Sequence, residues 1–314
     1  MAVQLAPGVE QELEQHRGEL TAYCYRMLGS GFEAEDAVQE AFIRAWRGID
    51  RFEGRAALRS WLYKIATNVC LDMLKSRERR ARPMDLGPAQ EPILELASIR
   101  PDEMWLEPMR DPADVAVERE GVKLAFVAAL QNLPARQRAA LILCEVLRWQ
   151  ATEVAELLET SVASVNSALQ RARATIGDRD MDAPAALDAD ARELLERYVA
   201  AFEEYDIDKL TALIREDAIQ SMPPYDLWLS GREDLMTWWF GPGLGCKGSK
   251  LVPAGTFNGG YPAYAQYKPG ESGYLEPWAI QVVDVSGDGV AELTFFIDTG
   301  TLFSRLGLPE RLEA

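Results

Sequence analysis

Histidine is nearly missing from this sequence of 314 residues, where His16 is the only one. A Ser-His-Asp triad that uses any histidine other than His16 and a multi-histidine metal site are therefore excluded. The four cysteines lack CxxC or Cys/His spacing, so we expect no disulfide framework, no metal and no cofactor. Apolar runs such as Ala139–Cys144 are far shorter than the roughly 20 residues of a membrane-spanning helix. The amino terminus carries no secretory pattern, so we expect a cytoplasmic protein without a membrane partner.

Basic residues are also few, with 33 Lys and Arg against 50 Asp and Glu, a net charge of -17. The charge is unevenly spread along the chain. Residues 55–82 carry eight basic and two acidic side chains, whereas residues 83–120 carry ten acidic and three basic ones. Residues 181–314 hold 22 acidic and 10 basic side chains. The global charge argues against nucleic acid, but the local basic segment is compatible with phosphate binding.

Proline marks the organisation of the chain, because six prolines between residues 83 and 114 rule out a continuous helix there. Helical periodicity precedes and follows this segment, and β-rich patterns dominate the last third. We expect a multidomain protein with two all-α modules and a carboxyl-terminal α+β domain. The expected parts are a helical bundle at residues 10–82, an acidic proline-rich linker at 83–114, a helix-turn-helix module at 115–179 and an α+β domain at 188–314.

The first helical block has one apolar and one polar face. Over residues 33–46 the apolar side chains, Phe42 and Trp46 among them, recur at helical spacing. Residues 61–80 again bury an apolar stripe and leave basic side chains and Asn68 outside. Cations suit phosphates, amides suit base edges and aromatic rings suit stacking, so the second of these helices fits nucleic acid. The alternative is an ordinary amphipathic helix with a solvated face.

The second helical block has the pattern helix, short turn, helix. Leu133 and Pro134 open one helix, Thr152 is the expected N-cap of the next, and the last helix follows Ser161. Its expected buried residues are Val162, Val165, Leu169, Ala172 and Ile176, and its expected exposed residues are Ser164, Asn166, Ser167, Gln170, Arg171 and Arg173. The exposed groups suit major-groove edges and phosphates. The alternative is a three-helix bundle with a solvated polar face.

Both blocks resemble a known family. Residues 36–80, DAVQEAFIRAW through LKSRERR, resemble region 2 of extracytoplasmic-function (ECF) sigma factors, and residues 133–176, LPARQRAALILCEV through QRARATI, resemble region 4. The two segments occur in the family's order. The resemblance implies a sigma factor, not an enzyme, that binds core RNA polymerase through the largest-subunit clamp coiled coil and the flap. It would direct initiation at promoters by recognising their -10 and -35 elements.

The resemblance also implies roles for individual positions. Core polymerase would contact Asp36, Gln39, Glu40 and Arg44; the -10 element would contact Gly54, Arg55, Ala56, Ala57, Tyr63, Lys64 and Asn68; the -35 element would contact Ser167, Gln170, Arg171 and Arg173. Asp72 stands where an amide or a basic residue is common, and it would repel phosphates unless Lys75 or Arg79 neutralised it. The linker corresponds to the segment that sigma factors thread through polymerase, with a disordered tether as the alternative.

The last third resembles a SnoaL-like domain in its opening, residues 194–224, and the tail of SnoaL-fused sigma factors in residues 302–312. The implied fold is an α+β cone with helical patterns at residues 188–204 and 206–216 and a hairpin joining strands 279–285 and 290–298. Residues available for a pocket at its mouth are Tyr198, Met222, Trp228, Trp238 and Trp278; a filled core is the alternative. Asp206, Asp217, Asp226 and Asp298 are candidate bases for an enzyme, but no spacing singles one out.

The charge pattern predicts that the acidic carboxyl-terminal domain contacts the basic sigma module and regulates it in cis. A separate anti-sigma factor is then not required. Two other functions remain open at this stage: a SnoaL-type enzyme with a DNA-binding amino-terminal part, and a helix-turn-helix repressor that binds intact operator DNA without polymerase.

Overall fold

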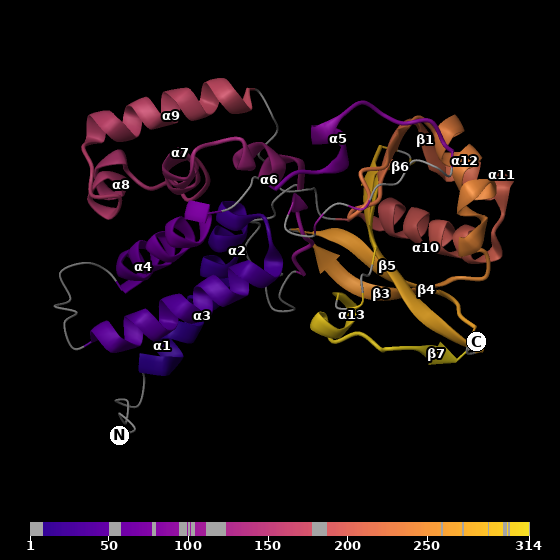
Figure 1. Cartoon of the computed structure of the whole chain (residues 1–314), viewed down its shortest axis with the longest axis horizontal. Helices are drawn as coiled ribbons and strands as arrows, with labels where there is room; N and C mark the ends of the chain where they lie inside the picture. Colours follow the sequence, from indigo (N-terminus) through magenta and orange to yellow (C-terminus); the bar gives the residue numbers. More distant parts are fainter. Residues whose placement is uncertain are drawn as a thin grey trace. The chain divides into compact units, whose positions relative to one another are not determined.

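In a computed structural model the chain forms two compact units (Figure 1). The first unit comprises residues 1–80 and 114–182, and the second comprises residues 81–113 and 183–314. The structure describes residues 9–49, 58–76, 80–93, 99, 101, 104–110, 124–177, 187–258, 260–271, 273–287, 289–297, 300 and 302–313. Among these residues no helix is both long enough and apolar enough to cross a lipid bilayer.

The first unit is helical, and local signals set several of its helix ends. Gly29 adopts a left-handed conformation (φ 74°) that ends one helix, and the Ser30 side chain accepts a hydrogen bond from the Glu33 amide at 3.1 Å to start the next. Ser161 caps the last helix in the same way. The elements are α1 (Val9–Gln15), α2 (Arg17–Leu28), α3 (Gly31–Gly48), α4 (Leu58–Met73), η2 (Leu74–Ser76), α6 (Leu124–Gln131), α7 (Ala135–Leu141), the π-helical turn η5 (Ile142–Val146), α8 (Ala151–Leu157) and α9 (Val162–Ile176).

Three sequence-based details of this unit are wrong. Helix α8 begins at Ala151 and is capped at Gln150, whose backbone N–H donates to Glu153, so Thr152 lies inside the first turn. Val162 (38% exposed) and Trp46 (41% exposed) lie near helix ends and are exposed, not buried. Their expected burial was inferred from the helical spacing of apolar residues alone. That spacing does not show where along a helix the tertiary contacts end.

The second unit is a curved mixed sheet covered by helices (Figure 1). The strand order is β2-β1-β6-β5-β4-β3, and β7 pairs with the start of β5. Strand β1 runs parallel to β6, and the other pairs are antiparallel. The elements are α5 (Pro83–Leu86), α10 (Ala189–Glu204), α11 (Ile207–Leu213), β1 (Ile214–Ser221), β2 (Trp228–Ser230), α12 (Arg232–Phe240), η6 (Pro242–Cys246), β3 (Lys250–Phe257), β4 (Tyr261–Pro269), β5 (Tyr274–Ser286), β6 (Gly289–Ile297), α13 (Leu302–Arg305) and β7 (Leu312–Glu313).

This architecture confirms the expected fold class, two all-α modules followed by an α+β cone. The predicted hairpin is β5 paired with β6. The helix expected over residues 206–216 ends earlier, at Leu213, because Ile214 already pairs with Val290 of β6. A strand that starts directly after a helix has no polar segment to mark the change.

The core of the second unit contains a chain of buried polar side chains. The Tyr198 hydroxyl donates to Gln281 at 2.9 Å, Gln281 donates to Gln266 at 2.8 Å, and Gln266 donates to Ser249 at 3.0 Å. All four residues are at most 2% exposed. Each amide in such a row needs its neighbour, because a buried polar group without a partner is costly.

Tyr198→Phe should therefore destabilise the second unit. The substitution leaves the buried Gln281 oxygen without its donor, and we expect the free energy of unfolding to fall by about 1–3 kcal/mol. Urea unfolding of the full chain, followed by circular dichroism, measures the change. The matched control is Tyr274→Phe, since Tyr274 is 38% exposed. Equal stability of Tyr198→Phe and the control would contradict this account of the core.

Candidate functional site

The predicted polymerase-binding residues lie on one exposed face of α3. Asp36, Gln39 and Arg44 are exposed and Glu40 is half-buried. Arg44 pairs with Glu40 at 2.7 Å along the helix and reaches Asp72 of α4 at 3.4 Å. The face is thus preformed, and its carboxylates at Asp36 and Glu40 are accessible to a basic partner.

Asp72 has a role that the sequence left unexplained. Its carboxylate accepts from Lys75 at 2.7 Å and from Arg44, and these hydrogen bonds and charges, that of Lys75 first, hold its pKa below the usual range. Arg79 lies outside the described residues. Asp72 is therefore an ionised surface residue that links α4 to α3 and whose charge is paired with Lys75 and Arg44.

The residues of α4 that were expected to face melted DNA differ in their surroundings. Tyr63 is fully buried, with its ring packed edge-on against Tyr23 (centroids 5.2 Å apart) and Trp149 (5.1 Å). Lys64 forms an ion pair with Glu159 at 2.9 Å, and Asn68 is exposed. Gly54, Arg55, Ala56 and Ala57 lie outside the described residues. In this conformation Tyr63 is not available for stacking on a base.

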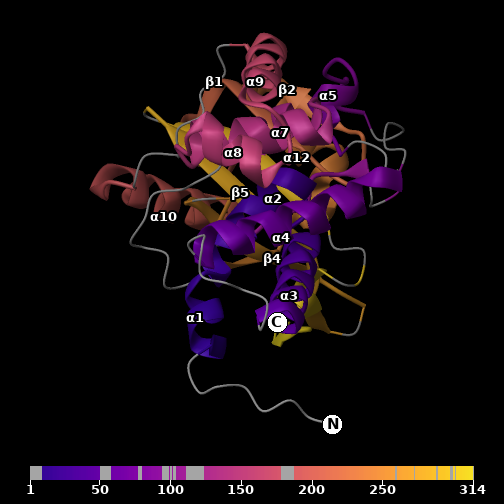
Figure 2. The same ribbon diagram turned by 90° about the vertical axis from the view of Figure 1, so that its left-hand side faces the viewer.

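The cover over α4 comes from the second helical block, since α4 lies beside α7 and α8 (Figure 2). Arg59 stacks on both Tyr63 and Trp149, with its guanidinium carbon 5.1 and 5.7 Å from the ring centroids. Behind this contact the buried Arg138 side chain of α7 donates to the Met27 carbonyl of α2 and to the Gln131 side chain. The two helical blocks are therefore joined by aromatic and polar contacts.

The predicted DNA-reading face of α9 is open to solvent. Gln170 and Arg171 are exposed, and Arg171 donates to Ser167 at 2.6 Å. Arg173 is paired with Glu145 of η5. On the opposite side of the helix Val165, Leu169, Ala172 and Ile176 are buried, as the periodicity predicts. One face thus anchors the helix while the other presents hydroxyl, amide and guanidinium groups.

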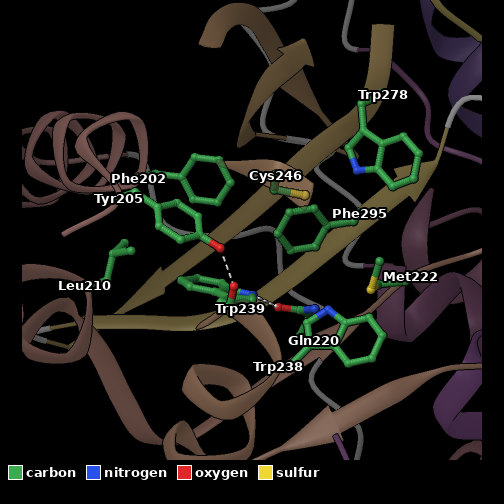
Figure 3. A pocket seen from close by; sticks show the side chains of 10 residues that line it. All are labelled: Phe202, Tyr205, Leu210, Gln220, Met222, Trp238, Trp239, Cys246, Trp278 and Phe295. Carbon is green, nitrogen blue, oxygen red and sulfur yellow. Dashed lines mark hydrogen bonds between the residues drawn. The ribbon is translucent and has the colours of Figure 1, made fainter. Parts of the chain in front are cut away.

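A pocket opens in the cone of the second unit (Figure 3). It is lined by Phe202, Tyr205, Leu210, Gln220, Met222, Trp238, Trp239, Cys246, Trp278 and Phe295. Three of the five expected residues, Met222, Trp238 and Trp278, line it. Tyr198 does not, because its hydroxyl is engaged in the core, and Trp228 does not, because its indole points to the linker.

None of the three candidate bases that the structure describes lines this pocket. Asp206 caps α11 by accepting from the Lys209 amide, Asp217 forms an exposed pair with Arg215, and Asp226 is not among the lining residues. Asp298 lies outside the described residues. Within the described part of the chain the pocket has no carboxylate at its wall and no histidine, so it offers no proton-transfer group beyond phenol, thiol and indole.

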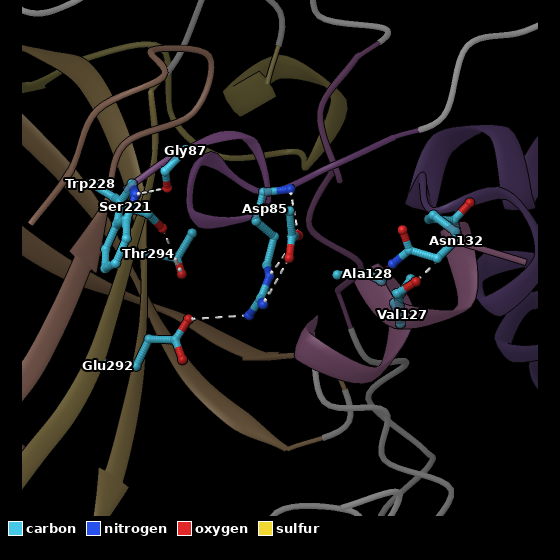
Figure 4. Close-up of polar contacts among 11 residues, drawn as sticks. Asp85, Gly87, Val127, Ala128, Asn132, Ser221, Trp228, Glu292 and Thr294 are labelled. Atoms are coloured by element: carbon cyan, nitrogen blue, oxygen red, sulfur yellow. Dashed lines mark hydrogen bonds and ion pairs between the residues drawn. The ribbon is translucent and has the colours of Figure 1, made fainter. Parts of the chain in front are cut away.

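The linker forms hydrogen bonds with the carboxyl-terminal part of its own unit. The Trp228 indole donates to the Gly87 carbonyl at 2.9 Å (Figure 4). The Gln90 backbone N–H donates to the Trp228 carbonyl at 3.0 Å. Further along, the Met109 backbone N–H donates to the Asn258 side-chain oxygen at 2.9 Å, and the Asn258 backbone N–H donates to the Met109 carbonyl. Arg110 reaches the Leu306 carbonyl at 3.1 Å.

Just before the linker, Arg82 lies between two carboxylates. It pairs with Asp85 at 3.3 Å and with Glu292 of β6 at 4.0 Å (Figure 4). Burial raises the pKa of the Glu292 carboxyl, while the charge of Arg82 works in the opposite direction. The sequence signal for this binding was weak: proline density predicted an irregular segment but not its partner.

Comparisons with known proteins identify the class. Residues 13–80 match the model of Sigma-70 region 2 and residues 123–176 match that of Sigma-70 region 4. The fold also resembles the crystal structure of the Mycobacterium tuberculosis extracytoplasmic function sigma factor SigJ, with a TM-score of 0.60 at 21% identity, over 96% of this chain and 99% of that one. Sigma-70 modules followed by an α+β cone therefore define a sigma factor with a fused carboxyl-terminal domain.

Closer relatives place the chain within that class. It is 43% identical over 311 residues to the ECF RNA polymerase sigma factor SigG of Mycobacterium tuberculosis H37Rv, covering 95% of this chain and 83% of SigG. It is 30% identical over 161 residues to ECF RNA polymerase sigma factor SigW of Bacillus subtilis, covering 50% and 81%. The chain belongs to the ECF sigma factors, which bind core RNA polymerase and promoter DNA and direct transcription initiation.

The contact between the two helical blocks predicts a zero-length cross-link. A carbodiimide should join Lys64 to Glu159, because their charged atoms are 2.9 Å apart and both side chains are accessible. Mass spectrometry of the digested full chain detects the linked peptides, and raised salt should lower the yield because exposed pairs are screened. Lys64→Arg serves as the negative control. Lys250 and Glu203, 3.1 Å apart, serve as the positive control. A Lys250–Glu203 link without a Lys64–Glu159 link would refute the closed arrangement.

Proposed function

We propose that this sigma factor is restrained in cis by its SnoaL-like domain, which holds the linker away from polymerase. The single observation that carries the proposal is the set of hydrogen bonds from the second unit to Gly87, Gln90 and Met109. In the proposal Asp36, Gln39, Glu40 and Arg44 bind core polymerase; Gly54, Arg55, Ala56, Ala57, Tyr63, Lys64 and Asn68 serve the -10 element; Ser167, Gln170, Arg171 and Arg173 serve the -35 element. The domain acts as a regulator, not as an enzyme.

The argument for restraint is one of mutual exclusion. A linker that runs through polymerase cannot keep the same amide and carbonyl groups bonded to Trp228 and Asn258. Within the linker, Leu106 and Trp105 are buried, at 2% and 3% exposure, and the Leu106 backbone N–H donates to the Ala81 carbonyl at 3.1 Å. The linker therefore exchanges the carboxyl-terminal domain for polymerase as its binding partner. The free energy of its contacts with that domain reduces the net affinity of the sigma factor for polymerase.

The closed state of the first unit supports the same proposal. Tyr63 is buried beneath Trp149 and Lys64 is paired with Glu159, so two of the proposed -10 contacts are engaged within the protein. Binding of a melted strand requires that the second helical block leave α4. Because residues 83–114 connect the two blocks, a bound linker also limits how far they can separate.

Substitutions on α9 test the assignment of promoter contacts. Gln170→Ala and Arg171→Ala should each weaken use of the cognate -35 element by about 1–3 kcal/mol, the usual value of a good hydrogen-bonded base contact. Arg173→Ala should weaken binding evenly across sequences and reduce its salt dependence. Run-off transcription with core polymerase on matched and mismatched -35 elements measures both effects. Arg192→Ala, an exposed arginine of α10, is the control. Unchanged promoter choice by Gln170→Ala and Arg171→Ala would remove the assignment.

Substitutions that loosen the linker test the restraint. Trp228→Phe removes the donor to Gly87, and Asn258→Gly removes the acceptor for Met109 while glycine tolerates the positive φ of 53° at that position. We expect each full-length variant to raise run-off transcription severalfold at limiting core polymerase, because one fewer hydrogen bond has to break when the linker is released. Tyr274→Phe, an exposed substitution in the same unit, should leave transcription unchanged. If both loosened variants match the wild-type chain, cis restraint through the linker is wrong.

A further inference from the structure

The pocket of the second unit has an uncharged wall. Its open space amounts to about 400 Å³, counted with the solvent at its mouth, and five of its ten lining side chains are Trp or Phe. Burial raises the pKa of both the Cys246 thiol and the Tyr205 hydroxyl, so these groups stay neutral near pH 7. A charged ligand would lose its hydration on this apolar wall. The Lys268 ammonium lies 3.3 Å from the centroid of the Trp278 ring, so the cation beside the wall already faces an aromatic ring. The wall therefore favours a small, planar, uncharged molecule.

One buried polar group gives the pocket a direction. Gln220 is 2% exposed, and its side-chain oxygen accepts from the Trp239 indole at 2.5 Å (Figure 3). The Tyr205 hydroxyl donates to the backbone carbonyl of Trp239. Among the described residues the Gln220 amide nitrogen donates to no other group. It remains available to donate to an acceptor oxygen on a ligand.

The wall of the pocket is also part of the linker's binding site. Met222 opens a turn that is closed by two backbone hydrogen bonds, Tyr225 N–H to the Met222 carbonyl at 2.9 Å and Met222 N–H to the Leu227 carbonyl at 3.1 Å. The linker residue Gln90 donates its side-chain amide to the Asp226 carbonyl of this turn at 3.0 Å and its backbone N–H to Trp228. The turn thus has the pocket on one side and the linker on the other.

We propose that this pocket is an effector site for a small, planar, uncharged molecule with one hydrogen-bond acceptor, and that occupancy weakens the hold of the Met222–Leu227 turn on the linker. The acceptor meets the Gln220 amide, and the ring stacks among the indoles. Displacement of Met222 shifts the turn as a whole, because its two hydrogen bonds couple its residues. The regulatory half of this inference rests on the proposed function, and the binding half does not.

Binding is tested on the full-length chain with three probes of one size. Acetophenone carries the acceptor, ethylbenzene lacks it, and benzoate replaces it with a charge. Indole N–H signals in nuclear magnetic resonance report binding, and the signals of Trp238, Trp239 and Trp278 are assigned with Trp→Phe variants. We expect acetophenone to bind about 3- to 10-fold more tightly than ethylbenzene and at least tenfold more tightly than benzoate. Gln220→Leu should abolish the difference between acetophenone and ethylbenzene. No binding of acetophenone, or equal binding of benzoate, would overturn the site.

Coupling to the linker is tested by hydrogen exchange at saturating acetophenone. The Gln90 amide, which donates to Trp228 beside the turn, should exchange severalfold faster. The Met109 amide, which donates to Asn258 away from the turn, should keep its rate and serves as the internal control. An unchanged Gln90 rate at saturation would overturn the coupling even if acetophenone binds. If Gln90 responds while Trp228→Phe leaves transcription unchanged, the effector site stands and the proposed restraint of initiation fails.

Discussion

A backbone amide or carbonyl of the linker can satisfy its hydrogen bond with only one partner at a time, and most of what this protein can do depends on that constraint. Unpaired backbone groups are costly once buried, so a segment that leaves one surface must be solvated or find another. Here the second unit supplies that partner at two separate places, Trp228 and Asn258. Two anchor points, one in strand β2 and one in the turn after β3, hold the segment more firmly than either alone, since release at one leaves the other in place.

The closed pair of helical blocks is built from contacts that water can replace. The Lys64–Glu159 pair is exposed, and such pairs contribute little to stability. The buried Arg138 side chain bonds the Met27 carbonyl across the contact, but its bonds to Gln131 lie within its own block and survive separation. Aromatic packing of Tyr63 on Trp149 supplies the apolar part. Opening of this interface would expose the Tyr63 ring and leave the Met27 carbonyl without its Arg138 donor.

Periodicity predicted the parts of the fold that depend on neighbours in sequence. The buried side of α9 at Val165 and Leu169 followed from spacing, and the fold class followed from the change between helical and alternating patterns. Burial of Tyr63 did not follow, because its cover, Trp149, comes from a block 86 positions further along the chain. Trp228 looked like a pocket residue for a similar reason. An indole can face a cavity or donate to a carbonyl, and only the tertiary partner decides.

Within the second unit, hydrogen bonds to neutral groups account for most of the contacts of the linker. Acidic excess in this part of the chain suggested docking on a basic surface, yet the contacts that bind the linker are mainly hydrogen bonds to neutral groups. Where a charge takes part, at Arg82 between Asp85 and Glu292, it is enclosed by carboxylates of the same unit. Burial alone would favour the protonated form of Glu292, so Arg82 is the group that favours its ionised form. The ion pair therefore links the start of the linker to β6, while the contacts of the linker at Trp228 and Asn258 are hydrogen bonds between neutral groups.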